Sequence, residues 1–174
     1  MKNIPLKERW FEDYSAGEVF EFGEHYVTES EVVSFANQYD PQFFHVNAEA
    51  AKTSLYGGLI ASGWMTTAIA MRMMCANFIP MESALGSPGV DELRWLHPVR
   101  PGDTLRMRAI VLKTQRSRSK PDRGVVTIRQ EVINHHGQIV MRLEGKSMHS
   151  LRPCMLNASE HPHEHSNGRG GLKN

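Results

Sequence analysis

Polar and hydrophobic side chains alternate with a period near two close to the start of the chain and through its second half, which predicts β-strands in both regions. The first such segment covers residues 18–27, and the pattern returns after residue 86. Gly and Pro interrupt the second region at intervals, as turns between antiparallel strands would. We therefore expect four further strands, over residues 90–98, 104–116, 124–134 and 138–150.

A helix is predicted directly after the first strand. Thr28 and Glu31 have the spacing of a capping box ahead of an apolar segment. Pro41 disfavours the α conformation at the residue before it, so the helix is expected to end by about Tyr39. Asp40 therefore belongs to a loop.

Two more helices are expected before the second group of strands. Asn47 is a candidate N-cap for a short helix over residues 47–56. The longest apolar segment, residues 59–79, contains one charged residue, Arg72, and is apolar on nearly every side, as expected of a helix enclosed by other structure. This order of elements predicts a single α+β domain in which an antiparallel sheet wraps around a long central helix.

The end of the chain has a different composition. Residues 154–174 contain few large apolar side chains and many polar, Gly and His residues, so we expect a disordered tail after a folded domain over residues 1–153. Three tail histidines alternate in a way that could capture a transition metal, but nothing rigid positions their rings. These are His161, His163 and His165, and we assign no metal site to them.

Composition and charge limit the classes of function. The chain has 174 residues, 40% of them hydrophobic, and 20 Lys and Arg residues against 19 Asp and Glu give a net charge of +1. This balance provides no strong field to attract nucleic acid or an anionic membrane. No segment has about 18 uninterrupted apolar residues, the length that a membrane span requires, and the cysteines suggest no disulfide framework. We expect a soluble cytoplasmic protein that uses no cofactor.

Asp40 and His45, in the segment DPQFFH, are the sharpest chemical feature of the sequence. A carboxylate and an imidazole close together are the usual partners for moving protons near neutral pH. On one continuous helix, residues five positions apart would point about 140° from each other. Pro41 breaks the helix, and a turning loop could aim both side chains at one water molecule. Taken alone, the spacing is more typical of an ordinary loop.

The segment GGLIASGW, residues 57–64, places small residues at the start of the long apolar helix. Helix starts present unpaired N–H groups and a partial positive charge, and glycine lets a ligand approach the backbone closely. A thioester oxygen needs these properties as it becomes an enolate. The same glycines would equally permit a tight turn and close helix packing.

From residue 18 to about residue 152, the sequence resembles the MaoC-like dehydratases, relatives of the (R)-specific enoyl-CoA hydratases. The resemblance rests on Asp40 and His45, on the downstream motif LIASG that ends at Gly63, and on the segment PGVDELRWLHPVRPGDTL at residues 88–105. It implies the hot-dog fold and a homodimer in which two sheets join edge to edge. It also implies reversible hydration of a 2-enoyl-CoA thioester, an acyl-CoA substrate, to a 3-hydroxyacyl-CoA.

The resemblance further implies roles for individual residues. Asp40 and His45 match the pair that binds and activates the catalytic water. The sequence does not decide which of the two takes the first proton, and we favour Asp40 as the base. Gly63 matches the glycine whose backbone N–H polarises the thioester carbonyl. Ser62 stands where the hydratases often carry His, and we expect it to bind the substrate. Gln42 stands where they usually carry Asn, in the position that supports Asp40.

Two alternative functions stay open. Many hot-dog thioesterases place a catalytic Asp or Glu on the central helix, and residues 60–79 contain neither. The second alternative is a non-catalytic subunit that only binds acyl thioesters. Such a subunit would have no need of a carboxylate beside an imidazole, so the intact Asp40 and His45 favour hydration.

Overall fold

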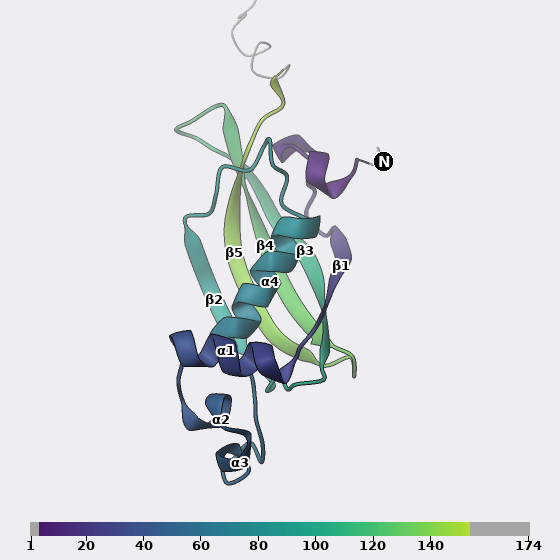
Figure 1. Cartoon of the computed structure of the whole chain (residues 1–174). Coiled ribbons are helices and arrows are strands. Elements are labelled where there is room, and N and C mark those ends of the chain that lie inside the picture. Colours follow the sequence, from purple (N-terminus) through teal and green to yellow (C-terminus); the bar gives the residue numbers. More distant parts are fainter. Residues whose placement is uncertain (1–3, 154–174) are drawn as a thin grey trace, which may run out of the picture.

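The computed structural model describes residues 4–153, and the predicted tail lies outside these residues. The described part has the predicted α+β architecture, with one antiparallel sheet of five strands and a long helix lying against it (Figure 1). None of the helices in this range is long and apolar enough to cross a membrane.

The elements follow one another in nearly the expected order. Two 3₁₀ turns, η1 (Leu6–Glu8) and η2 (Phe11–Asp13), precede the first strand, β1 (Val19–Tyr26). The helices are α1 (Glu29–Tyr39), α2 (Phe43–Val46), α3 (Ala48–Ala51) and α4 (Gly63–Asn77). The remaining strands are β2 (Gly89–Trp95), β3 (Thr104–Arg116), β4 (Arg123–Asn134) and β5 (Ile139–Ser150). In the sheet the strands are ordered β1-β3-β4-β5-β2, so β1 and β2 form the edges.

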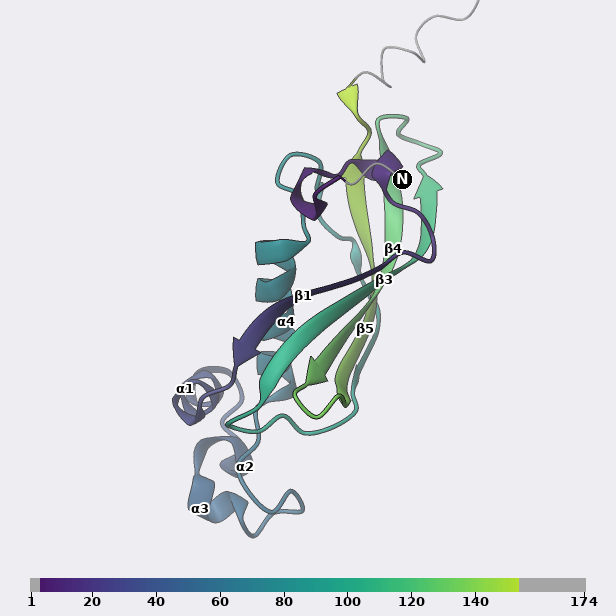
Figure 2. The ribbon, with the colours of Figure 1, turned by 90° about the vertical axis from the view of Figure 1, so that its right-hand side faces the viewer.

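The core lies between the sheet and α4, which Figure 2 shows as two separate layers. Every second residue in the first half of β3 points into this core, as its alternating pattern requires, and the inward residues are Leu105, Met107, Ala109 and Val111. They meet buried side chains of α4, among them Met65, Ile69 and Met73. The predicted strand over residues 104–116 is confirmed at both ends.

The start of the predicted central helix is wrong by four residues. The expected span was 59–79, but the helix begins at Gly63. The backbone before it is bound by neighbouring segments instead: Ile60 N–H donates to Phe44 O at 3.2 Å and Ala61 N–H to Val99 O at 2.8 Å. These bonds hold the preceding segment in extended form up to the point where Ser62 caps the helix.

The expectation that α4 is enclosed on all sides is also wrong for a single chain. Its outward face leaves Trp64 and Met71 more than half exposed, at 58% and 51%, and Arg72 is exposed as well. The sheet therefore covers one side of the helix. The apolar side chains on the other side are left uncovered by the described residues of this chain.

The segment around α1, α2 and α3 agrees with the sequence in its caps and differs in its helix lengths. The capping box is confirmed, since Thr28 Oγ1 accepts from Glu31 N–H at 3.2 Å, and Asn47 caps α3. The predicted helix over residues 47–56 is shorter than expected, because α3 ends at Ala51. His45 lies in the single turn of α2 and not in a loop.

Candidate active site

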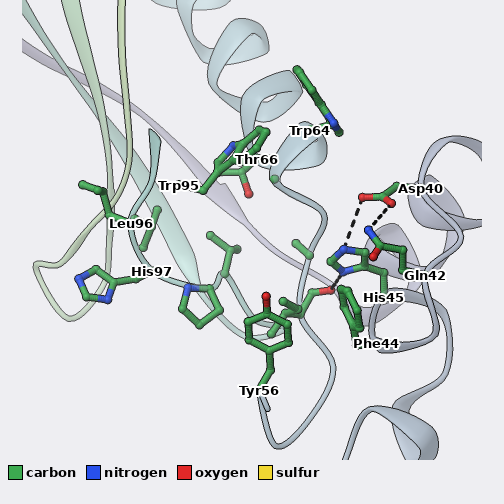
Figure 3. A pocket seen from close by; sticks show the side chains of 16 residues that line it. Asp40, Gln42, Phe44, His45, Tyr56, Trp64, Thr66, Trp95, Leu96 and His97 are labelled. Carbon is green, nitrogen blue, oxygen red and sulfur yellow. Dashed lines mark hydrogen bonds and ion pairs between the residues drawn. The ribbon is translucent and has the colours of Figure 1, made fainter. Parts of the chain in front are cut away.

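The C-terminal end of α1, the short helix α2 and the extended segment before α4 meet at one end of the sheet. They enclose a cavity of about 480 Å³ together with residues that follow β2. Figure 3 shows Asp40, Gln42 and His45 on one side of this cavity, with Trp95, Leu96 and His97 across from them. The two predicted catalytic side chains are therefore brought together in a cavity large enough for a small-molecule group.

The backbone carbonyl of Ile60 fixes the orientation of His45. The imidazole is buried, with 5% of the residue exposed, and its Nδ1 lies 2.8 Å from Ile60 O. Because a carbonyl oxygen can only accept a hydrogen bond, Nδ1 carries the proton in the neutral ring. Nε2 then has a free lone pair, and it faces Asp40 Oδ2 at 3.4 Å.

Two side chains hold the carboxylate of Asp40 in place. Ser62 Oγ donates to Oδ2 at 2.6 Å, and Gln42 Nε2 donates to Oδ1 at 2.8 Å. The hydrogen bond from Ser62 has the largest effect on the pKa of Asp40 and lowers it. Burial has the next largest effect and raises this pKa, while the hydrogen bond from Gln42 and the nearby His45 lower it further, so the net shift is downward. Asp40 is thus a carboxylate at neutral pH.

The facing atoms of Asp40 and His45 are both hydrogen-bond acceptors. An ionised carboxylate has only lone pairs, and so has Nε2 of this tautomer. They cannot bond to each other, but both can accept from one molecule that has two hydrogens to donate. A water molecule between them would be oriented with its oxygen lone pairs directed away from the pair.

Gly63 is the first residue of α4 and lines the cavity. Its backbone N–H has no acceptor within residues 4–153, because the first N–H groups of a helix lack an intrahelical partner. A Cβ at this position would lie 2.5 Å from ring carbons of Trp95. Only glycine therefore lets the indole of Trp95 pack against the helix start at this position.

Ser62 lies behind Asp40 and away from the cavity. The residue is fully buried, at 0% exposure, and does not line the cavity. Its hydroxyl donates to Asp40 and accepts from Trp64 N–H at 3.2 Å, which caps α4. This geometry supports a positioning role for Ser62 toward Asp40, which we propose, and the expected contact of Ser62 with the substrate stays a prediction.

The sequence did not indicate that Ile60 and Trp95 contribute to this site. Ile60 acts through its carbonyl, which every residue has, so no side-chain pattern could indicate it. Trp95 lies in the segment over residues 88–105 that carries the family resemblance. Its place in that segment was the signal that could have indicated its role in the site.

Comparisons with known proteins agree with this architecture. Residues 13–135 match the family model described as MaoC like domain. The MaoC-like dehydratase from Rhodospirillum rubrum is 40% identical, with a TM-score of 0.79 over 83% of this chain and 99% of that one. A protein described as a monoamine oxidase regulatory protein, from Archaeoglobus fulgius, is 30% identical, with a TM-score of 0.75 over 83% and 96% of the two chains. The R-hydratase PhaJ1 from Pseudomonas aeruginosa, 21% identical, shares the fold with a TM-score of 0.65 over 85% of this chain and 88% of its own.

Proposed function

We propose, from the premise that the chain belongs to the MaoC-like domain family of hydratases and dehydratases, that it catalyses the reversible hydration of a 2-enoyl-CoA thioester to a 3-hydroxyacyl-CoA. One observation carries the proposal. Two acceptors, Asp40 Oδ2 and His45 Nε2, converge at 3.4 Å beside the free N–H of Gly63 in one cavity. An acceptor pair suits a water molecule, and a free N–H suits a developing enolate oxygen.

In the proposed reaction, the thioester oxygen accepts a hydrogen bond from Gly63 N–H. The water held by Asp40 and His45 attacks C3 and gives one proton to this pair. The π electrons of the C2–C3 bond form a double bond between C2 and the thioester carbonyl carbon, and the π electrons of the C=O bond move onto the thioester oxygen. The enolate then collapses, and a proton from the protein forms the C2–H bond. The product has gained one hydroxyl at C3 and one hydrogen at C2, and the protein is unchanged.

The hydrogen bonds of this site favour His45 as the group that carries the proton. Ser62 and Gln42 lower the pKa of Asp40, which keeps it ionised and weakens it as a base. The free lone pair of His45 Nε2 is the better acceptor, because imidazole is the side chain that most often serves as a general base. The charge of Asp40 then stabilises the imidazolium until its proton reaches C2. The sequence left the first proton undecided between the two side chains and favoured Asp40, so this proposal reverses that preference.

The test is a turnover assay with a panel of 2-enoyl-CoA thioesters that differ in chain length. Hydration removes the conjugated double bond without releasing a thiol, whereas a thioesterase releases free CoA thiol, so the two readouts separate the leading function from its main rival. We expect Asp40→Asn and His45→Ala each to lower kcat at least about 100-fold, the low end for loss of a general acid or base. Near-normal turnover in both variants would refute the assignment.

We also propose that the chain forms a homodimer through the edge of the sheet at β2. This strand pairs with β5 and with no other strand of the described part. The apolar side chains beside that edge are exposed, namely Val90, Trp95 and Leu96, together with Trp64 and Met71 on the uncovered face of α4. A second copy would cover them next to the cavity. Light scattering of the purified chain measures the mass directly.

A further inference from the structure

Asp103 meets two consecutive histidines that follow it by more than thirty residues, His135 and His136, at the end of the sheet opposite the β3–β4 hairpin. Asp103 lies in the turn before β3, and His135 and His136 lie in the turn between β4 and β5 (Figure 1). One ligand atom from each residue lies within 4.8 Å of the others. We propose that Asp103, His135 and His136 bind a divalent transition-metal ion of the zinc class. The inference does not depend on the proposed hydration.

The donor set has the chemistry that such an ion prefers. Imidazole nitrogens suit Zn²⁺, Ni²⁺ and Cu²⁺, and two imidazoles with one carboxylate leave a fourth position for water. The imidazole rings of His135 and His136 already lie with their centroids 3.9 Å apart. Asp103 Oδ1 lies 3.4 Å from His135 Nδ1, and this is the only ion pair that Asp103 makes within residues 4–153. Its charge is therefore not already neutralised there by Lys or Arg.

The ligands stand on ordered turns. Asp103 is 7% exposed, and its Oδ2 accepts from Arg100 N–H at 2.8 Å, which leaves Oδ1 for an ion. Asn134 Oδ1 accepts from the backbone N–H of His136 at 3.1 Å and of Gln138 at 2.9 Å. The turn between β4 and β5 is therefore stabilised by its own hydrogen bonds.

Only a small adjustment is needed for coordination. Tetrahedral zinc with bonds of about 2.1 Å places its ligands about 3.4 Å apart, compared with the present limit of 4.8 Å. His136 is exposed, and its ring makes no hydrogen bond within the described residues, so it is free to turn toward the other two. One rotamer change of His136 can bring its ring nitrogen closer to the other two ligand atoms by the required distance.

An ion here would join two turns that lie beside the active-site cavity. Arg100 belongs to the same turn as Asp103, and its guanidinium donates to Tyr56 O at 2.5 Å and to Leu59 O at 3.5 Å. Tyr56 in turn lines the cavity. Binding should therefore stabilise the end of the domain that holds the proposed catalytic residues.

The test uses the full chain with the tail histidines His161, His163 and His165 replaced by Asn, so that they cannot compete for the metal. After treatment with a chelator, calorimetric titration with Zn²⁺ is expected to show one ion bound per chain, and Zn²⁺ is expected to raise Tm. His136→Asn should weaken this binding at least about tenfold and abolish the rise in Tm.

Because His136 makes no side-chain hydrogen bond within residues 4–153, His136→Asn should leave the fold intact. Asp103→Asn is a second variant, and it keeps an oxygen that can accept from Arg100. Asp91→Asn, an exposed carboxylate on β2, is the matched control and should bind Zn²⁺ as the parent does. The proposal is overturned if the parent shows no saturable binding, or if His136→Asn and Asp103→Asn bind Zn²⁺ as tightly as the parent.

Discussion

Two carboxylate–imidazole pairs in this protein have the same separation but different surroundings. The distance between the imidazole Nε2 and the carboxylate oxygen is 3.4 Å both for His45 with Asp40 and for His25 with Glu31. Each pair also lines a cavity, of about 480 Å³ for the first and about 450 Å³ for the second. Distance and cavity volume therefore do not by themselves distinguish the proposed catalytic pair from the pair of His25 and Glu31.

The hydrogen bonds around the two pairs do distinguish them. A backbone carbonyl fixes the tautomer of His45, and Ser62 and Gln42 keep Asp40 ionised and oriented. In the second pair, the carboxylate of Glu31 accepts from the backbone and hydroxyl of Thr28 and so caps α1. Nε2 of His25 has no hydrogen-bond partner within residues 4–153. The comparison teaches that an acid–base pair needs partners that fix its protons.

The largest expected difference is in turnover. Asp40→Asn combined with His45→Ala should lower kcat/KM at least about 100-fold and little more than either change alone, because residues that act as a unit are not additive. His25→Asn and Glu31→Gln should each leave kcat/KM within about twofold. Steady-state kinetics with the best substrate of the panel measure both. A comparable loss in the His25 or Glu31 variants would remove the distinction between the two pairs.

A third imidazole shows the effect of burial in the absence of hydrogen bonds to the described residues. His149 is 1% exposed, and neither ring nitrogen has a hydrogen-bond partner in the described part of the chain. Burial lowers its pKa from the ordinary 6.5 to about 4. The unfolded chain therefore takes up a proton below about pH 6.5 that the folded chain does not accept until about pH 4. The free energy of unfolding should fall by roughly 2 kcal/mol from this residue between about pH 7 and pH 5.

Urea titrations at several pH values measure this loss of stability. His149→Phe, which keeps a ring next to Tyr14, should remove the contribution, whereas the exposed His97→Asn should keep it. If His149→Phe loses as much stability on acidification as the parent, the buried imidazole is not its source.

The smallest effect concerns the support of Asp40. Ser62→Ala removes a hydrogen bond to a charged group, so we expect kcat to fall about tenfold. The pKa of Asp40 should rise, because that bond stabilises only the ionised form, and an NMR titration of the carboxyl carbon measures this. Ser62→Thr should restore both values. Asn47→Ala, which removes the cap of α3 without touching Asp40, should leave the pKa of Asp40 unchanged. An unchanged pKa in Ser62→Ala would contradict the positioning role.

Local sequence patterns were sufficient for much of the fold. The alternation of β3, the capping box of Thr28 and Glu31, and the effect of Pro41 on Asp40 all depend on neighbours in the chain, and the structure agrees with each. The start of α4 was predicted too early because its boundary depends on distant backbone partners, Phe44 and Val99, that compete for the N–H groups of the preceding segment. No propensity of residues 59–62 contains that information.

The features of the site likewise fall into those that the sequence indicated and those that depend on the tertiary structure. The sequence by itself indicated Asp40 and His45 and, through the family resemblance, Gly63, since these depend on residue types and on motifs along the chain. The tertiary structure placed Gly63 at the first position of the helix. Only the tertiary structure decided which protons the pair carries, because the carbonyl of Ile60 and the hydroxyl of Ser62 reach it from 15 and 22 residues away. It likewise decided that Asp103 meets His135 and His136, because strand pairing brings those two turns together.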